Sequence, residues 1–275
     1  TARSRGLGDV YKRQEKYLIK RKITFKKTIN ESDVVKKYFR YLSRSKISST
    51  SIKRKYSSLS SYFSYLLDRK IIKKNPLNGI YTPKLIKKLP TVLSVEEIEK
   101  IFKQSENSDN ELLGLRDRCI IELLYSCGLR VSELCSLKIN NLQFDSNVIR
   151  FFGKGNKERI IPLTFYAKEW LEKYLYQSRQ ILSNRKSSEQ KFVFVSNNGK
   201  RLTRAAIWQS IKKYVKAAGI VKTVSPHTFR HSFATHLVDG GANLIEIQKL
   251  LGHSDISTTE ISVSYTHLTL PTIRE

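Results

Sequence analysis

Three prolines within twenty residues limit how this chain can fold. Pro76, Pro83 and Pro90 lie in the segment IIKKNPLNGIYTPKLIKKLP, residues 71–90, together with one glycine and two Lys-Lys pairs. Proline has no backbone N–H, and the residue before it avoids the α-helical conformation, so neither a long helix nor an inner strand can pass through this segment. We therefore predict an extended, basic connector between two domains, with the linker itself at residues 83–89.

Before the connector, apolar residues recur at helical spacing. Two such stripes are formed by Val35, Tyr38, Phe39 and Leu42, and then by Ile52, Tyr56, Leu59, Phe63, Leu66 and Leu67. A stripe of this kind is typical of helices that bury one face against each other. The pattern predicts helices over residues 31–69, within a small helical domain at residues 14–82.

The remaining faces of these helices are basic. The candidates for contact with phosphate groups are Lys36, Lys37, Arg40, Lys53, Arg54 and Lys55. Over the whole chain 51 Lys and Arg oppose 24 Asp and Glu, a net charge of +27, and such a field attracts polyanions. Nucleic acid is the partner that this charge favours. Charge alone leaves open DNA, RNA and a solvated outer face.

After the connector, helix signals predominate. Ser94 and Glu97 form a capping box ahead of the apolar residues of LSVEEIEKIF. The apolar run from residue 110 predicts a buried helix that ends at Gly128, since glycine readily adopts the left-handed conformation at a helix end. Further helices are predicted at residues 164–178 and 203–218 and through most of the last third of the chain.

Two segments of this second domain favour strands instead. NVIRFFGKGNKERIIPL predicts a hairpin around a Gly-Lys-Gly-Asn turn, and KFVFVS, residues 191–196, predicts one short strand. The predicted fold class is therefore mainly α with a small antiparallel β-sheet, and the second domain occupies residues 90–262.

The two ends of the chain differ in composition from its interior. We interpret residues 1–13 and 263–275 as non-native tails, the alternative being ordinary frayed termini. Cys119, Cys127 and Cys135 lie among apolar residues without metal-ligand spacing, which indicates buried reduced thiols. The sequence shows no signal peptide and no membrane-spanning run. We expect a cytoplasmic protein without a membrane partner.

The segment SPHTFRHSFATHL, residues 225–237, carries the first candidates for chemistry. His227, Arg230 and His231 fall at i, i+3 and i+4 of a helix that Ser225 caps and Pro226 begins. Free backbone N–H groups at a helix start favour anions, so this cluster predicts a phosphate site. A surface basic cluster is the equal alternative. A zinc site at the two histidines is a minor one, because the glutamate of a metalloprotease motif is missing.

Other candidates lie at chain turns. Arg130 stands between a helix-ending glycine and a new helix, where it suits bidentate phosphate recognition or a structural pair with Glu133. Lys154 is at the tip of the predicted hairpin, and His253 follows the glycine of LLGH. Ser257 with Glu260 predicts one more capped helix.

Together these pieces resemble the tyrosine recombinase, or phage integrase, family, most closely its Xer-type bacterial members, over residues 14–261. The motifs are GLRVSEL, GKGNKER, H-x-x-R and LLGH, in that order. The resemblance implies catalytic roles for Arg130, Lys154, His227, Arg230 and His253. It also implies a helical, SAM-like core-binding domain, here shortened at its N-terminus, and a mixed α+β catalytic domain. The two would form a C-shaped clamp on double-stranded DNA, in a homo- or hetero-tetramer on paired recombination sites.

The implied reaction joins a tyrosine to the 3′ phosphate of a cut strand and needs no nucleotide cofactor and no metal, because the phosphotyrosine stores the bond energy and arginines stabilise the charge. The family pattern places the nucleophile where Ser262 stands here, whereas Tyr265 lies three residues later. On a helix this offset rotates a side chain by about 300° and advances it by ~4.5 Å. Tyr265 is thus a provisional nucleophile. The alternatives are a recombinase fragment that binds DNA without cutting it, and an RNA-binding protein without an active site.

Overall fold

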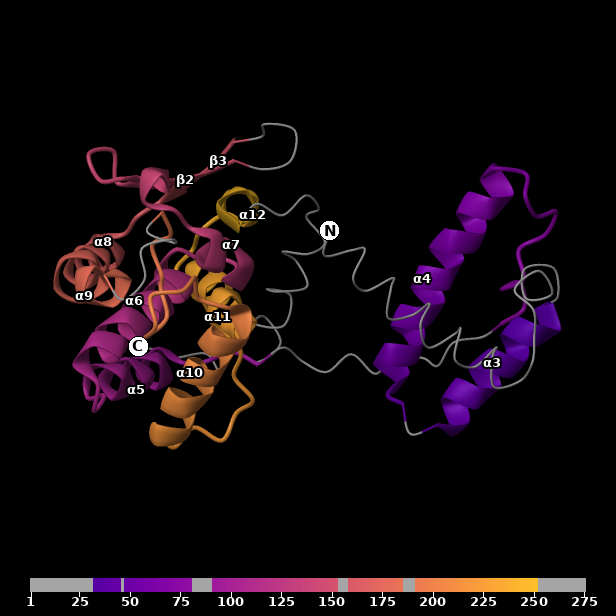
Figure 1. The fold of residues 1–275 in the computed structure, drawn as a ribbon, viewed down its shortest axis with the longest axis horizontal. Coiled ribbons are helices and arrows are strands. Elements are labelled where there is room, and N and C mark those ends of the chain that lie inside the picture. The colour runs from indigo at the N-terminus through magenta and orange to yellow at the C-terminus, as the bar shows by residue number, and fades with distance from the viewer. Residues whose placement is uncertain (1–31, 46, 81–90, 153–157, 185–190, 252–275) are drawn as a thin grey trace. The chain divides into compact units, whose positions relative to one another are not determined.

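The computed structural model describes residues 32–45, 47–80, 91–152, 158–184 and 191–251 (Figure 1). The chain divides into two compact units, Thr1–Lys88 and Leu89–Glu275, and each has its own hydrophobic core. Each unit is therefore described by itself. The predicted limits of the two domains stay predictions, and the linker at 83–89 lies outside the described residues.

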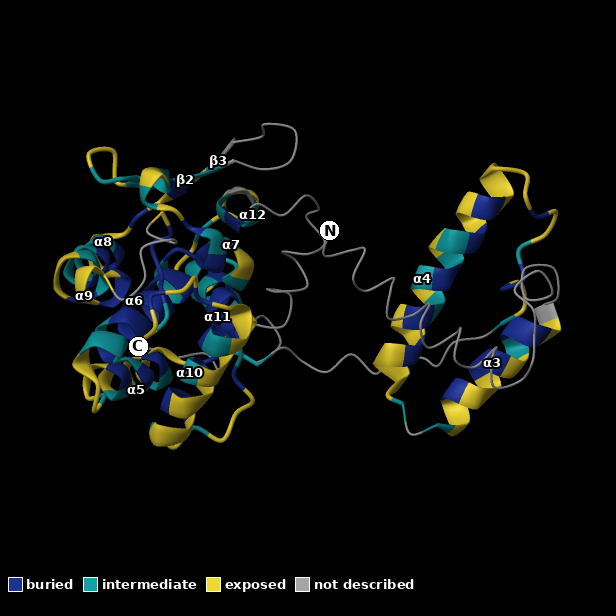
Figure 2. Ribbon diagram, viewed as in Figure 1, coloured by how far each residue is buried: buried dark blue, intermediate teal, exposed yellow. Residues whose placement is uncertain are grey.

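The described part of the first unit contains two helices, α3, Ser32–Arg44, and α4, Ser49–Asp68. The side chain of Ser48 caps α4 by accepting a hydrogen bond from the backbone N–H of Ser51. Figure 2 shows that each helix buries one side and exposes the other. The predicted apolar stripes supply the buried side, with the exception of Leu67, which is exposed. Leu67 directly follows the buried Leu66, and one residue turns a helix by about 100°.

Part of the predicted connector belongs to this first core. Ile72 and Leu77 are buried against the α3 and α4 residues. Around Leu77 the backbone turns, since the N–H of Asn78 donates to the carbonyl of Asn75. The prediction of an extended connector is therefore wrong for residues 71–80. The prolines exclude regular helix and strand there, but they do not prevent apolar neighbours from packing.

The second unit is built around one buried helix. Its first helices are α5, Val95–Glu106, α6, Glu111–Ser126, and α7, Val131–Ser136. The predicted capping box of Ser94 and Glu97 is confirmed at the start of α5. α6 is buried along most of its length and contacts α5 and later helices on several sides (Figure 2). Because α6 is packed on several sides, its C-terminal end is held in a fixed position.

The sheet follows α7 and a short 3₁₀ turn, η1, Ile139–Asn141. Its antiparallel strands are β1, Leu142–Gln143, β2, Val148–Phe152, and β3, Glu158–Pro162, in the order β1-β2-β3. The two predicted strands are confirmed as an antiparallel pair, with Phe151 opposite Arg159 and Ile149 opposite Ile161, while the predicted Gly-Lys-Gly-Asn turn lies outside the described residues. The register places Arg159 on the same face as the buried Ile161, because side chains alternate along a strand.

Helices complete the unit. After α8, Phe165–Lys173, the chain continues through a π-helical turn, η2, Tyr174–Arg179, into α9, Gln180–Ser183. The last three helices are α10, Arg204–Ala217, α11, Pro226–Asp239, and α12, Leu244–Leu251. α12 packs on α11 through a small cluster around Ala234, Ile247 and Leu251.

The strand predicted at KFVFVS is wrong in its detail. The segment forms only isolated bridges, Phe192 with Lys138 and Val195 with Arg201. Side chains occupy the carbonyls that a neighbouring strand would use. The Arg179 Nε donates to the Phe192 and Val193 carbonyls, and the Tyr174 hydroxyl donates to Val193 as well.

The fold is therefore mainly α with a small three-stranded antiparallel sheet, as predicted. Cys119, Cys127 and Cys135 are buried and free of disulfides, as the sequence indicates. Within the described ranges, no helix is long and apolar enough to cross a membrane.

Candidate active site

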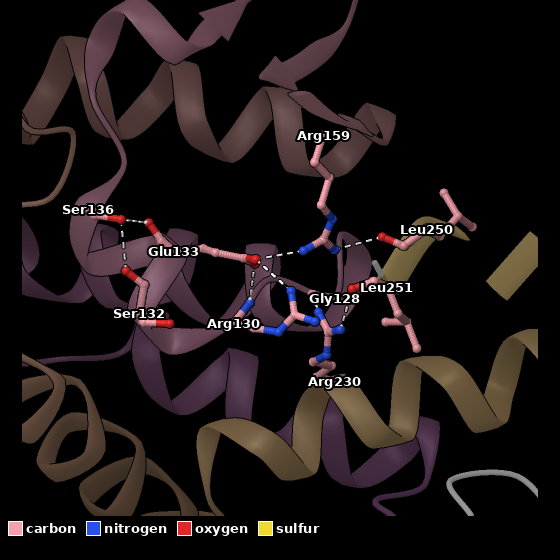
Figure 3. Close-up of polar contacts among 9 residues, drawn as sticks. All are labelled: Gly128, Arg130, Ser132, Glu133, Ser136, Arg159, Arg230, Leu250 and Leu251. Atoms are coloured by element: carbon pink, nitrogen blue, oxygen red, sulfur yellow. Dashed lines mark hydrogen bonds and ion pairs between the residues drawn. The ribbon is translucent and has the colours of Figure 1, made fainter. Parts of the chain in front are cut away.

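The first predicted arginine lies in the tight connection between α6 and α7. Gly128 lies two residues after the end of α6 and has a φ of +56°, and Arg130 directly precedes α7. The backbone N–H of Arg130 donates to Oε2 of Glu133 at 2.8 Å, and its Nη1 donates to Oε1 at 2.8 Å (Figure 3). The Arg–Glu pair considered from the sequence thus exists, and it fixes a guanidinium whose side chain is still 34% exposed. A fixed and accessible guanidinium suits a phosphate ligand.

The second predicted arginine reaches the same connection from α11. Pro226 begins α11, and Arg230 follows one turn later with only 6% of its surface exposed. Its Nη1 donates to the carbonyl of Gly128, and its Nη2 donates to the carbonyl of Leu251 at 2.5 Å. Arg230 therefore joins the end of α6 to the end of α12.

A third arginine completes the cluster. Arg159 on β3 donates from Nη1 to Oε1 of Glu133 at 2.6 Å and from Nη2 to the carbonyl of Leu250 at 2.7 Å. Figure 3 shows the three guanidiniums directed toward one another, around Glu133 and the end of α12. Residues far apart in the sequence therefore concentrate positive charge at one place.

The three guanidiniums and one carboxylate give the cluster a net positive charge, and burial is the main cause of the pKa shifts within it. Burial, reinforced by the charges of Arg130 and Arg159, lowers the pKa of Arg230 to about 9, which leaves the group charged at neutral pH. Burial also lowers the pKa of Arg159, and Glu133 opposes this effect. Two buried cations side by side raise each other's free energy, and a bound anion would relieve that repulsion.

The histidines of α11 differ in their surroundings. His227, in the first turn, is exposed, whereas His231 is partly buried and its pKa is lowered by burial. The first turn of a helix presents free N–H groups, so His227 lies where an anion is favoured. No group of three His, Cys, Asp or Glu side chains that could hold a metal ion occurs among the described residues.

Four predicted residues fall outside the described part of the chain. These are Lys154, His253, Ser262 and Tyr265. Their predicted roles therefore stay predictions. Their sequence neighbours are described, however. In the sequence, Lys154 falls between the residues of β2 and those of β3, and His253 follows Leu251 by two residues.

Two tyrosines of the second unit, Tyr125 and Tyr214, lie in its helical core and make hydrogen bonds there. Tyr214 is buried, its hydroxyl donates to Oδ2 of Asp117 at 3.2 Å, and burial raises its pKa to about 12. The hydroxyl of Tyr125 lies 2.9 Å from Nδ1 of His236, within the packed region between α6 and α11. Both hydroxyls are therefore engaged in hydrogen bonds within the second unit.

The basic candidates of the first unit separate into two groups. Lys37, Arg40, Lys53 and Arg54 are exposed, and Lys36 is half-exposed beside Asp33. Lys55 is buried, so its predicted place on an outer face is wrong. The reason is helical spacing, because Lys55 lies three residues after Ile52 and four before Leu59, on the packed stripe.

A basic cleft of about 550 Å³ lies on the first unit. Its lining includes Lys36, Arg40 and Arg44, which recur every four residues along α3 and thus share one face. Arg44 is absent from the candidates predicted from sequence, although the same spacing would have included it. The cleft offers a row of cations to a polyanion.

Arg159 is the main residue that the sequence reasoning missed. It lies inside the motif GKGNKER, in which only Lys154 is a predicted site residue. Strand alternation is the signal that could have found it. Arg159 shares a strand face with Ile161, and a charged side chain on a buried face requires a specific partner.

A solved structure has the same fold. The XerH site-specific recombinase, bound to its difH substrate in a pre-cleavage complex, matches with a TM-score of 0.68 over 87% of this chain and 68% of that one, at 24% identity. At this identity the likeness defines the fold, which is that of site-specific recombinases.

Sequence comparison gives the family. Residues 91–270 match the phage integrase family profile, and this chain belongs to that family. Tyrosine recombinase XerD of Lacticaseibacillus casei is 47% identical over 197 residues, which are 72% of this chain and 65% of that protein. XerD of Listeria monocytogenes serotype 4b is 48% identical over 195 residues, 71% of this chain and 64% of that protein. The chain thus spans about two thirds of the length of these relatives.

Proposed function

We propose that this chain acts in site-specific DNA recombination, by cutting and rejoining DNA through a 3′-phosphotyrosine intermediate. The observation that carries the proposal is the convergence of Arg130 and Arg230, a hundred residues apart, on the connection between α6 and α7. Both stand at the arginine positions of the family motifs. Family membership and the site-specific recombinase fold support the same conclusion.

The proposed reaction uses these residues without a redox change. A tyrosine oxygen attacks the scissile phosphorus, a bond forms to the 3′ phosphate, and the bond to the 5′ oxygen breaks. Arg130 and Arg230 stabilise the charge that concentrates on the phosphate oxygens, and His227 and His253 donate hydrogen bonds to it. His227 also helps to remove the tyrosine proton, and Lys154 protonates the departing 5′ oxygen. Attack by a new 5′ hydroxyl reverses the step and rejoins the strand.

The proposed partner is double-stranded DNA. The solved XerH complex holds a DNA recombination site, and the net charge of this chain is +27. The cleft along α3 places three cations on one face of the first unit, in reach of a phosphate backbone. We further propose a homo- or hetero-tetramer of recombinases on two paired sites, because strand exchange between two duplexes requires four cuts.

A second candidate function is DNA binding without cleavage. The observation that favours it is Ser262, which stands where the family motif has its tyrosine, with Tyr265 three residues later. Strand transfer is sensitive to misplacement of ~1 Å, so an offset of this size would leave the arginine cluster without its nucleophile. The cluster would then bind the phosphate only.

One experiment separates the two candidates. The chain is incubated with a pool of nicked duplexes of randomised sequence, in which the cut strand diffuses away and the covalent complex accumulates on a denaturing gel. We expect a complex in the wild type, its loss in Tyr265→Phe, and a decrease in rate of about a hundredfold or more in Arg130→Ala. Lys173→Ala, which removes an exposed partner of Glu169, is the matched control.

The outcomes are distinct. DNA binding without any covalent complex would establish the non-cleaving function. A normal rate in Arg130→Ala would refute the assignment of the active site.

A further inference from the structure

Arg159 connects two parts of the site that belong to different segments of the chain. One Nη group donates to Glu133 at the start of α7, and the other donates to the carbonyl of Leu250 at the end of α12. A planar guanidinium holds its donors in a fixed geometry, so the two acceptors keep a set spacing while both hydrogen bonds are made. A lysine at this position would offer a single point charge and could not fix both.

The first contact bears on Arg130. Oε1 of Glu133 accepts from both Arg130 and Arg159, while Oε2 accepts the backbone N–H of Arg130. The carboxylate is thus held from two sides. Without Arg159, Glu133 would interact with Arg130 alone, and more of its negative charge would offset the guanidinium that faces the phosphate.

The second contact bears on the end of α12. The last carbonyls of a helix lack intrahelical donors and carry partial negative charge, so cations stabilise them. Arg159 takes the Leu250 carbonyl and Arg230 takes the Leu251 carbonyl, which fixes the last turn at two successive positions (Figure 3). In the sequence, His253 follows Leu251 by two residues.

Stability alone does not account for Arg159. Its side chain is 17% exposed, and its Nε is buried without a hydrogen-bond partner among the described residues. Burial of a cation costs free energy that an apolar residue on the same strand face would not. The hydrogen bonds to Glu133 and Leu250 are therefore what this position provides.

We propose that Arg159 is a positioning residue. It connects the Glu133 carboxylate, which holds Arg130, with the last turn of α12, which precedes His253 in the sequence. It touches neither substrate nor reacting atoms. The inference rests on the proposed function, because the catalytic roles of Arg130 and His253 are part of that proposal.

The test has one arm that needs no DNA. Backbone hydrogen exchange is followed residue by residue by NMR in wild type, Arg159→Gln and Arg159→Lys. We expect exchange at Arg130, whose N–H is bound by Glu133, and at Ile247–Leu251 to rise by about tenfold in Arg159→Gln, as for loss of a charged hydrogen bond. Exchange within α6 should stay the same.

Arg179→Lys is the matched control. Arg179 is also a partly buried arginine that donates to backbone carbonyls, those of Phe192 and Val193, but on a different part of the unit. It should leave exchange at Arg130 and in α12 unchanged. Equal exchange there in Arg159→Gln and wild type would overturn the proposal.

The second arm measures the chemistry. With the nicked duplexes above, Arg159→Gln should slow covalent-complex formation by about a hundredfold while the Kd for DNA stays within about twofold, as for a loss of preorganised geometry. Arg159→Lys should recover only part of the rate. Wild-type cleavage with an undiminished rate in Arg159→Gln would overturn the inference and leave the proposed function intact. If the wild type itself does not cleave, the cleaving function fails, and the exchange arm alone decides whether Arg159 holds the two segments.

Discussion

Glu133→Gln is the substitution whose effect the geometry defines best. The carboxylate accepts three hydrogen bonds of 2.6–2.8 Å, two of them from guanidiniums. Hydrogen bonds to charged groups contribute about 1.5–3 kcal/mol each. Glutamine keeps one acceptor oxygen but no charge, and the Arg130 side chain, 34% exposed, is partly screened by water. We therefore expect a loss of about 3 kcal/mol in the free energy of unfolding of the second unit.

Tryptophan fluorescence in urea measures this loss selectively. The chain has two tryptophans, Trp170 in α8 and Trp208 in α10, and both belong to the second unit. Glu169→Gln is the control, since its pair with Lys173 is about 41% exposed and such surface pairs contribute less than ~1 kcal/mol. If Glu133→Gln unfolds within ~0.5 kcal/mol of this control, the carboxylate does not hold the arginine cluster.

Three further predictions follow from single contacts. Gly128→Ala should destabilise the second unit by about 2–4 kcal/mol in the same fluorescence assay, because φ is +56° and a Cβ would meet the Phe233 ring at 2.8 Å. Burial lowers the pKa of His231, so the stability contributed by its neutral form is present above the unfolded pKa of 6.5 and is lost as pH falls below that value. His231→Gln should therefore reduce the decline in stability between pH 7 and pH 5, as measured in urea melts. For DNA binding, Arg40→Gln should reduce the slope of log affinity against log salt by about 0.9, whereas Lys55→Met should leave it unchanged, since only Arg40 is exposed.

The features that the sequence predicts correctly depend on residues that are close together in the chain. The capping box of Ser94 and Glu97 and the left-handed stop at Gly128 involve residues within one helical turn, and both are present. The placement of Arg130 before a helix and of Arg230 inside one follows from the same local signals.

The errors of prediction have a common cause. The predicted apolar stripe of α4 includes Leu67, which is exposed, and leaves out Lys55, which is buried at the same helical spacing between Ile52 and Leu59. The prolines of residues 71–80 predict an extended connector, whereas Ile72 and Leu77 pack into the core of the first unit. Composition describes what a segment avoids, whereas burial depends on what lies next to it in space.

Arg159 illustrates the part that no local pattern supplies. Its partners are Glu133, 26 residues earlier, and Leu250, 91 residues later. Alternation along β3 could indicate that its side chain points inward, but only the packing of three segments shows which groups receive it.

The choice of partners within the cluster also makes chemical sense of its two predicted catalytic arginines. Arg130 is held by a carboxylate, and that carboxylate is shared with Arg159, so its negative charge is divided between two guanidiniums. Arg230 donates to the backbone carbonyls of Gly128 and Leu251, which orient a guanidinium without cancelling its charge. Burial, with a smaller effect of the neighbouring arginines, lowers its pKa to about 9, so the guanidinium is still positively charged at neutral pH. A phosphate that arrives between these groups gains attraction that the protein has already oriented, which is the condition for stabilising charge in a transition state without rearrangement.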